Sequence, residues 1–340
     1  MPTSEKRWRT GLVVGEFLPP HVGHAYLIRT ARSGSRVVHV CVADHPTHQI
    51  PARVRGQWLA AAFPDTHVHV IPAAYIDGDL DLYAEHIHDV VGGRPDLLYS
   101  SAEYGAELAE RLGAEAVRVE QVRHAVPITA LAIREDPVRM WRYILPEAKV
   151  GLCRRVCLNG AGSTGKTTLA RRLADYYDTN WVREYGRDYT VEKVAAGTAG
   201  AWSTADLIHI AHMQQVIEDE ATRLAGPLLF CDTDALATQL WHERYVGHMD
   251  PEIQALVDAR RYDLYVLCGD EIALEDDGVR DTDELRGWMQ QRFREELDKR
   301  PEPWIEVRGP VEHRLAAVVS EIDRLGLLRS ESIFEHSRFG

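Results

Sequence analysis

Short apolar runs rich in β-branched residues alternate with amphipathic stretches along the chain from residue 11 onward. This alternation is typical of βαβ units and predicts parallel sheets. In the first half we expect strands at residues 12–15, 37–42, 68–71, 97–99 and 116–119, and helices that begin near residues 24, 52, 82 and 103. In the second half we expect strands at residues 156–158, 181–183, 228–231, 264–267 and 305–307, and helices that begin near residues 166, 204, 236, 282 and 311. Because the pattern occurs twice, the predicted fold class is α/β with two doubly wound parallel-sheet domains.

The boundary between the two halves is expected near Pro146. A chain of 340 residues is longer than one hydrophobic core usually organises. Proline disrupts helix interiors, and Pro146 follows a helical stretch just before the second series of strands begins. We therefore predict a first domain at residues 10–146 and a second at residues 150–328. The polar residues 329–340 are expected to form a frayed tail.

Composition narrows the class of protein. No apolar run is long enough to span a bilayer, and the first ten residues are polar and basic, which leaves no room for a cleavable signal segment. The five cysteines lie mostly in strand-like runs and indicate reduced, buried thiols. We therefore expect a cytoplasmic protein without a membrane partner.

The net charge of the chain limits the kinds of molecule that it can bind. Acidic residues outnumber Lys and Arg by 52 to 39, giving a net charge of −13, which argues against a nucleic-acid-binding surface. Anionic substrates must then be held locally, by backbone amides, helix N-termini and a few well-placed cations.

Residues 160–167, GAGSTGKT, match the G-x-x-x-x-G-K-[ST] pattern between an apolar strand and a helical stretch. In this pattern glycines let backbone amides converge on phosphates, the lysine reaches the β and γ phosphates, and the hydroxyl contacts Mg²⁺. Lys166 and Thr167 take these two positions. The predicted ATP-binding residues of this half are Gly160, Gly162, Ser163, Thr164, Gly165, Lys166, Thr167 and Thr168.

Three acidic or basic positions could complete a phosphotransferase in the second half. Asp232 ends an apolar strand and is the expected second Mg²⁺ ligand, with Asp234 as the alternative. Glu184 follows the strand at residues 181–183 and could accept the proton of an attacking hydroxyl, although a surface carboxylate beside an arginine is the other interpretation. Arg280, in the charged segment 275–280, could stabilise the transferring phosphoryl group, or could belong to an ordinary charged turn.

The first half carries a different motif at residues 15–24, GEFLPPHVGH, which follows the first strand and opens a helix. His21 and His24 therefore lie at a helix N-terminus, where free amides and the helix dipole attract phosphate. Gly23 lets the backbone approach a ligand closely.

This decapeptide resembles the G-x-F-x-P-x-H-x-G-H signature of the nucleotidylyltransferase superfamily, whose members transfer a nucleotidyl group from ATP. Residues 128–134, ITALAIR, resemble that superfamily's second signature, I-S-x-T-x-x-R, with Leu131 in place of its threonine. The resemblance implies a Rossmann-like nucleotidylyltransferase domain in which His21 and His24 are catalytic. It implies ATP-binding residues Gly15, Phe17, Pro19, His21, His24, Thr129 and Arg134.

A nucleotidylyltransferase domain followed by a P-loop kinase resembles the NadR family over nearly the whole chain, including residues 134–137, 184–189, 232–234 and 277–280. The resemblance implies ribosylnicotinamide kinase and nicotinamide mononucleotide (NMN) adenylyltransferase activities, with ATP, ribosylnicotinamide, NMN and NAD as ligands and Mg²⁺ as cofactor. It implies catalytic roles for Lys166, Glu184, Asp232 and Arg280, and substrate-binding roles for Tyr185, Arg187, Asp188 and Asp234. About ten residues precede the first predicted strand, too few for the helix-turn-helix repressor domain of some members, so a transcriptional role is not implied.

One departure from the family affects the first site: Glu16 stands where members commonly have lysine, and a carboxylate there would repel a triphosphate. Two other interpretations stay open at this point. The P-loop could serve a kinase for another nucleoside, because the motif recognises ATP and not the acceptor. Alternatively, the first domain could be a non-catalytic nucleotide sensor. The sequence also leaves open whether the chain forms a homo-oligomer.

Overall fold

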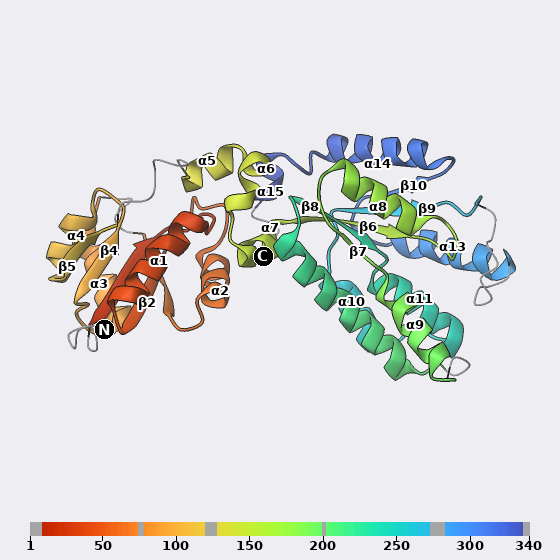
Figure 1. The fold of residues 1–340 in the computed structure, drawn as a ribbon, viewed down its shortest axis with the longest axis horizontal. Coiled ribbons are helices and arrows are strands. Elements are labelled where there is room, and N and C mark those ends of the chain that lie inside the picture. The colour runs from red at the N-terminus through yellow and green to blue at the C-terminus, as the bar shows by residue number, and fades with distance from the viewer. Residues whose placement is uncertain (1–8, 74–77, 120–127, 199–201, 273–282, 336–340) are drawn as a thin grey trace. The chain divides into compact units, whose positions relative to one another are not determined.

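The computed structural model describes residues 9–73, 78–119, 128–198, 202–272 and 283–335. The chain divides into two compact units (Figure 1). The first comprises residues 1–152 together with residues 330–340, and the second comprises residues 153–329.

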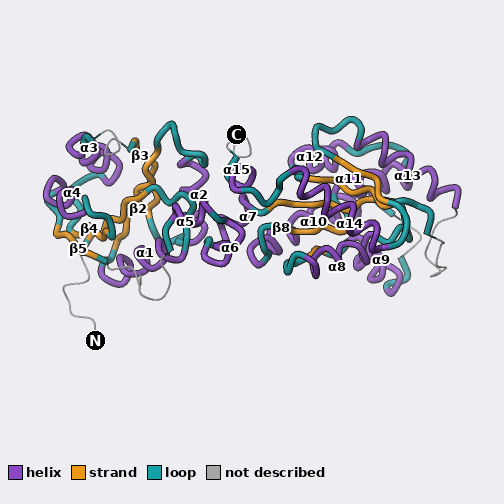
Figure 2. The backbone as a smooth tube through the Cα atoms, turned by 90° about the horizontal axis from the view of Figure 1, so that it is seen from above, coloured by secondary structure: helices purple, strands orange, loops and turns teal. Residues whose placement is uncertain are grey.

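The first unit is a parallel sheet with helices on both faces (Figures 1 and 2). Its strands are β1 (Thr10–Gly15), β2 (Val37–Asp44), β3 (His67–Pro72), β4 (Leu97–Ser100) and β5 (Glu115–Arg118), in the order β3-β2-β1-β4-β5. Its helices are α1 (Val22–Gly34), α2 (Ala52–Ala62), α3 (Leu80–Val91), α4 (Gly105–Leu112), α5 (Ala130–Glu135), α6 (Pro137–Met140) and α7 (Pro146–Leu152), with a 3-10 turn at Trp141–Tyr143. Side chains alternate along β1, so Val13 packs with the α1 and α2 side and Leu12 with the α3 and α4 side.

The second unit repeats this architecture with a different strand order. Its strands are β6 (Arg154–Asn159), β7 (Trp181–Val182), β8 (Leu228–Asp232), β9 (Leu264–Cys268) and β10 (Trp304–Val307), in the order β10-β9-β6-β8-β7. Its helices are α8 (Lys166–Tyr176), α9 (Tyr185–Ala195), α10 (Thr204–Leu224), α11 (Ala235–Val246), α12 (Pro251–Ala259), α13 (Asp283–Leu297) and α14 (Val311–Leu325). Every residue of β6, β8 and β9 is buried, as expected for central strands covered on both faces.

The strand orders fix where ligands can bind. In the first unit β1 lies between β2 and β4, and in the second unit β6 lies between β8 and β9. The connections leaving these central strands and their neighbours run in opposite directions across the sheet, which opens a crevice at the carboxyl ends of the strands. Residues 15–24 and the P-loop each follow the central strand of their sheet and therefore lie at this crevice.

The predicted fold class is confirmed, since both sheets are parallel and doubly wound. All ten predicted strand positions carry strands, although β7 spans two residues only. The helices that pattern analysis missed are mainly short or lack an apolar stripe. Helix α9, for example, has no buried residue, so no hydrophobic periodicity marks it. None of the helices in the described ranges combines the length and apolar character needed to cross a bilayer.

The expectation of a frayed C-terminal tail is wrong for residues 330–335. Helix α15 (Ser330–Ile333) forms there, and Ile333 and Phe334 are 0% and 1% exposed. The Ser330 hydroxyl donates a hydrogen bond to the carbonyl of Arg134, which connects this segment to α5 of the first unit. The overlooked signal is the apolar pair Ile333 and Phe334 within a polar segment. Pro146 follows a helical stretch that ends at Tyr143, as expected, but it begins α7, and the first unit continues to Leu152.

The buried Phe334 side chain yields a prediction about stability. Phe334→Ala should lower the free energy of unfolding by about 3 kcal/mol, because it removes a buried aromatic ring and leaves a cavity. Calorimetry or urea unfolding measures the change. Leu82→Ala, at a position on α3 that is 40% exposed, is the control and should cost much less. Equal stability of the Phe334 variant and the wild type would contradict the burial of this segment.

Candidate active sites

In the first unit, His21 and His24 form the start of α1. His21 is the N-cap residue, and its Nδ1 accepts a hydrogen bond from the Gly23 amide at 3.0 Å. The His24 Nδ1 accepts from the His21 amide at 3.3 Å, which completes a capping box made of two imidazoles. The two rings stack with centroids 3.7 Å apart, and Phe17 packs edge-on against His24 at 4.8 Å.

This geometry sets the protonation state of both rings. Burial lowers the pKa of His21 to about 4, and burial together with the neighbouring His21 lowers the pKa of His24. A ring nitrogen that accepts an amide hydrogen bond carries no proton, so each neutral ring has its proton on Nε2. The helix N-terminus therefore presents two neutral Nε2–H donors, a combination suited to polarising phosphate oxygens without adding net charge.

The second predicted motif of this unit lies against the first. Thr129 is the N-cap of α5 and accepts from the Ala132 amide at 3.0 Å. The Arg134 guanidinium donates to the Leu18 carbonyl at 2.5 Å, so the loop before His21 is held by a residue more than a hundred positions away. The next residue of that loop is Pro19, and the Leu145 amide donates to the Pro20 carbonyl at 3.1 Å. The structure thus brings Phe17, His21 and His24 together and places Arg134 against the loop that precedes the histidines, while Thr129 begins the helix that carries Arg134.

Glu16 has a setting that the sequence did not reveal. Its carboxylate lies 3.9 Å from His48 Nε2, and its backbone carbonyl accepts a hydrogen bond from the fully buried Arg55. Arg55 also donates to the carbonyls of Ile50 and Ala43, at 2.7 and 3.0 Å. Glu16 therefore lies near the buried Arg55 guanidinium, whereas burial lowers the pKa of His48. Leu131, the other departure from the family pattern, is 56% exposed.

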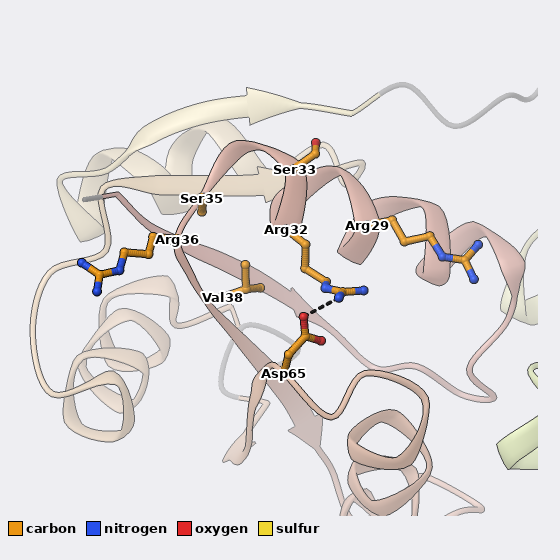
Figure 3. A pocket seen from close by; sticks show the side chains of 7 residues that line it. All are labelled: Arg29, Arg32, Ser33, Ser35, Arg36, Val38 and Asp65. Atoms are coloured by element: carbon orange, nitrogen blue, oxygen red, sulfur yellow. Dashed lines mark hydrogen bonds and ion pairs between the residues drawn. The ribbon is translucent and has the colours of Figure 1, made fainter. Parts of the chain in front are cut away.

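A separate cavity of about 290 Å³ lies around the C-terminal end of α1, the opposite end of the helix from His21 (Figure 3). Its lining includes three arginines, of which Arg32 forms an ion pair with Asp65. The guanidinium groups of Arg29 and Arg36 point to opposite sides in Figure 3. Because these cations do not converge on one point, the cavity is not built like an anion site.

In the second unit the P-loop adopts the conformation that its glycines permit. Gly160 has φ of 143° and Gly165 has φ of 82°, both in the range that favours glycine. A Cβ on Gly160 would lie 2.8 Å from the Cys268 carbonyl oxygen, so a larger residue would clash with backbone. Lys166 Nζ donates to the Gly160 and Ala161 carbonyls, each at 2.9 Å, and thus lies across the loop. Gly162 and Ser163 are half-buried, Thr164 is fully buried, and Thr168 is exposed on α8.

Asp232 and Thr167 offer oxygens suited to a hard divalent cation. Thr167 Oγ1 donates to Asp232 Oδ2, whereas Asp232 Oδ1 is buried without a hydrogen-bond partner among the described residues. Burial raises the pKa of Asp232, and the Lys166 ammonium opposes that rise. In the described ranges no three His, Cys, Asp or Glu side chains are arranged to hold a metal. The site therefore fits Mg²⁺, which commonly binds through one or two protein oxygens together with substrate phosphates and water.

Glu184 lies at the same edge of the sheet. Val182 pairs with Cys231, so Glu184, two residues further, follows the end of β7 beside the end of β8 at Asp232. Glu184 is the N-cap residue of α9, and the positive charge of Arg187, in the first turn, opposes the rise that burial causes in the pKa of Asp232. The Asp188 carboxylate forms an exposed ion pair with Arg183 at 2.9 Å. Arg280 lies outside the described residues.

Asp234 does not occupy the position expected of a substrate ligand. It is 2% exposed and caps α11 by accepting from the Ala237 amide at 3.2 Å. It also accepts hydrogen bonds from Asn159 Nδ2 at 3.3 Å and from Tyr265 Oη at 3.1 Å. Its carboxylate oxygens are thus engaged inside the protein, and burial raises its pKa. Asp234 therefore stabilises the start of α11 and is not free to bind a substrate through these oxygens.

Three buried residues that sequence reasoning missed contact the backbone of the P-loop from the protein side. They are Arg286 and Gln290 on α13 and Arg314 on α14, with exposures of 6%, 0% and 2%. Gln290 Oε1 accepts from the Ala161 amide at 3.2 Å, while both arginines donate to carbonyls of the loop. Apolar periodicity does not reveal such residues, because a buried arginine on a helix looks like a solvated one in the sequence.

Known proteins share the fold of this chain. The family described as an AAA domain matches residues 155–314, which include the P-loop. A crystal structure of a NadR protein in complex with NR has a TM-score of 0.69 at 22% identity and covers 94% of this chain and 96% of its own. A NadR structure in complex with NAD and AMP-PNP has a TM-score of 0.67 at 21% identity with the same coverage. Fold and sites define an α/β protein in which a nucleotidylyltransferase-type domain precedes a P-loop kinase domain.

Two curated relatives narrow this class to one family. The trifunctional NAD biosynthesis/regulator protein NadR of Escherichia coli strain K12 is 32% identical over 295 residues, which span 79% of this chain and 71% of that protein. NadR of Salmonella typhimurium strain LT2 is 32% identical over 293 residues with the same coverage. The chain belongs to the NadR family.

The lowered pKa of His21 leads to a prediction about pH. Unfolded His21 takes up a proton near pH 6.5 but the folded residue does so only near pH 4, so its contribution to stability is complete above pH 6.5 and is lost as pH falls to 4. His21→Asn keeps a good N-cap that does not titrate. Between pH 7 and pH 4 the wild type should therefore lose up to about 3 kcal/mol more unfolding free energy than this variant.

Urea unfolding at several pH values measures this difference. His313→Asn, at an exposed position on α14, is the control and should follow the wild type. Parallel pH profiles for wild type and His21→Asn would mean that the capping imidazole is not held neutral by burial.

Proposed function

We propose that this chain catalyses two consecutive steps of NAD biosynthesis. The second unit transfers the γ-phosphoryl group of ATP to the 5′-hydroxyl of ribosylnicotinamide and forms NMN. The first unit transfers AMP from ATP to NMN and forms NAD and pyrophosphate. The observation that carries the proposal is the presence, in one chain of the NadR family, of two different loop motifs at residues 15–24 and 160–167, each following the central strand of its own sheet.

For phosphoryl transfer, the second unit supplies positioning and charge. Lys166 neutralises the β and γ phosphates, and amides of the P-loop bind their oxygens. Glu184 accepts the proton of the ribose hydroxyl as the hydroxyl attacks phosphorus. Arg187, in the first turn of α9, adds positive charge near the transferred group. Thr167 and Asp232 would hold Mg²⁺, which would neutralise developing charge on the phosphates.

The acceptor is proposed to lie along the start of α9. Tyr185, Tyr189, Trp202 and His209 form a chain of aromatic rings there, with neighbouring centroids 5.6 to 6.4 Å apart. Ribosylnicotinamide carries a positively charged pyridinium ring, and aromatic faces attract such cations. Neutral nucleosides lack this charge, so the aromatic cluster supports ribosylnicotinamide over a neutral nucleoside as the acceptor.

For adenylyl transfer, the first unit needs no general base, because the phosphate of NMN is already a nucleophile. The nucleophile attacks the α-phosphorus of ATP and pyrophosphate leaves. The Nε2–H groups of His21 and His24 donate to phosphate oxygens as charge develops, and Arg134 orients the triphosphate. Donors that are already in place before the reaction stabilise the negative charge that develops on the phosphate oxygens in the transition state of adenylyl transfer.

One assay tests the proposal as a whole. The purified chain is incubated with ATP, Mg²⁺ and ribosylnicotinamide, and the products are identified by chromatography. NAD with pyrophosphate is expected. Accumulation of NMN alone would limit the proposal to the kinase, consistent with a nucleotide-sensing first unit, and phosphorylation of another nucleoside in preference would overturn the choice of acceptor.

Lys166→Ala separates the two activities. It should abolish phosphorylation of ribosylnicotinamide and leave adenylyl transfer to added NMN largely unchanged, because each unit has its own phosphate site. Both activities are measured on the same preparation. Lys299→Ala, which alters an exposed lysine of the second unit, is the control and should retain both. A folded Lys166 variant that loses both activities would contradict separate sites.

Glu184→Gln tests the general base. Turnover of the kinase should fall roughly a hundredfold or more, with ATP binding preserved, because a general base contributes this order of rate and does not hold the nucleotide. Glu192→Gln, at an exposed position on the same helix, is the matched control. Near-normal turnover of Glu184→Gln would transfer the role to Asp188, since the buried Asp234 is already engaged in capping α11.

A further inference from the structure

The carbonyl groups of the P-loop are held by two buried guanidinium groups. Arg286 Nε donates to the Gly162 carbonyl at 3.0 Å, and Arg286 Nη2 donates to the Ser163 carbonyl at 3.4 Å. Arg314 Nη1 donates to the Thr164 carbonyl at 2.6 Å. Three consecutive peptide groups of the loop therefore receive hydrogen bonds from helices more than a hundred residues further along the chain.

These contacts determine the direction of the loop amides. In a trans peptide the carbonyl of one residue and the amide of the next point in opposite directions, and the peptides from Gly162 to Gly165 are trans. Holding the carbonyls of Gly162, Ser163 and Thr164 on the protein side turns the amides of Ser163, Thr164 and Gly165 to the other side. Those amides belong to the part of the motif that surrounds phosphate in P-loop proteins. The Ala161 amide is excluded from this set, because it donates to Gln290.

The two arginines are themselves fixed. Arg286 Nη2 also donates to the Ile272 carbonyl at 2.7 Å. Arg314 Nε donates to the Gly309 carbonyl at 2.8 Å, and its Nη2 forms an ion pair with Glu271 at 2.6 Å. A buried cation is costly unless it is paired or fully hydrogen-bonded, so such side chains have little freedom to move. Both guanidinium groups also polarise the peptide groups that they contact, which strengthens the amides opposite them as donors.

We propose that Arg286 and Arg314 are positioning residues for ATP: they hold the P-loop in its phosphate-binding conformation before the nucleotide arrives and act only through the loop backbone. The proposal rests on the proposed kinase site but concerns its nucleotide half alone. Lysine at either position keeps the charge but cannot reproduce the planar fork of donors that contacts several carbonyls. The loop would then be ordered by the nucleotide itself, at the expense of affinity.

The test compares Arg286→Lys and Arg314→Lys with the wild type. Calorimetric titration with ADP and with AMP, without acceptor, should show ADP binding weakened about tenfold in each variant, as expected when a charge-assisted hydrogen bond is lost, with little change for AMP. In the kinase assay the Michaelis constant for ATP should rise by a similar factor. Turnover at saturating ATP and the Michaelis constant for ribosylnicotinamide should stay within about threefold, because a less ordered loop weakens ATP binding equally in the ground state and the transition state. Arg324→Lys, on the exposed part of α14, is the matched control and should match the wild type.

The outcomes are distinguishable. If the wild type binds no ADP, the proposed kinase function fails and not the positioning role alone. If the wild type binds ADP and both lysine variants bind it equally well, the positioning role is overturned. Reduced turnover with unchanged ADP affinity would indicate a smaller folded fraction, and it also overturns the proposal, as would failure of both variants to fold. Thermal unfolding without nucleotide monitors that last case.

Discussion

A loop that turns its amides toward a phosphate must turn its carbonyls toward the protein, and those carbonyls need hydrogen-bond donors where water does not reach. In both units guanidinium groups donate to carbonyls of the motif loop. Arg55 and Arg134 contact the carbonyls of Glu16 and Leu18 in the first unit, and Arg286 and Arg314 contact the P-loop in the second. An arginine suits this task because one planar group donates in several fixed directions.

The two motif loops differ in the charge of the side chains that lie beside them. In the second unit a cation, Lys166, lies across the loop, and Asp232 is at hand for a metal. In the first unit the corresponding groups are neutral imidazoles at a helix N-terminus. The motif loop of the second unit therefore carries full charges, whereas that of the first unit carries neutral donors and the dipole of a helix end.

Most of the fold and the parts of the sites next to strands could be predicted from the sequence. Strand ends and glycine-rich loops leave local signals, so the positions of the P-loop, Asp232, Glu184 and the two histidines at strand ends could be predicted. The partners that hold these loops could not be found, because Arg286 and Arg314 contact them only through tertiary packing of α13 and α14. Asp234 was misassigned for the same reason: the sequence shows an acid after a strand, and only the fold shows that it is buried as a helix cap.

The return of residues 330–335 to the first unit makes that unit discontinuous along the chain. During synthesis, the elements from β1 to α7 leave the ribosome early. The segment that contains Ile333 and Phe334 follows only after the whole second unit has been translated. Domains generally fold as the ribosome releases them, N-terminal first. Here the second unit can complete its core while the first still lacks a buried piece of its own, so the domain that starts folding first is the one that finishes last.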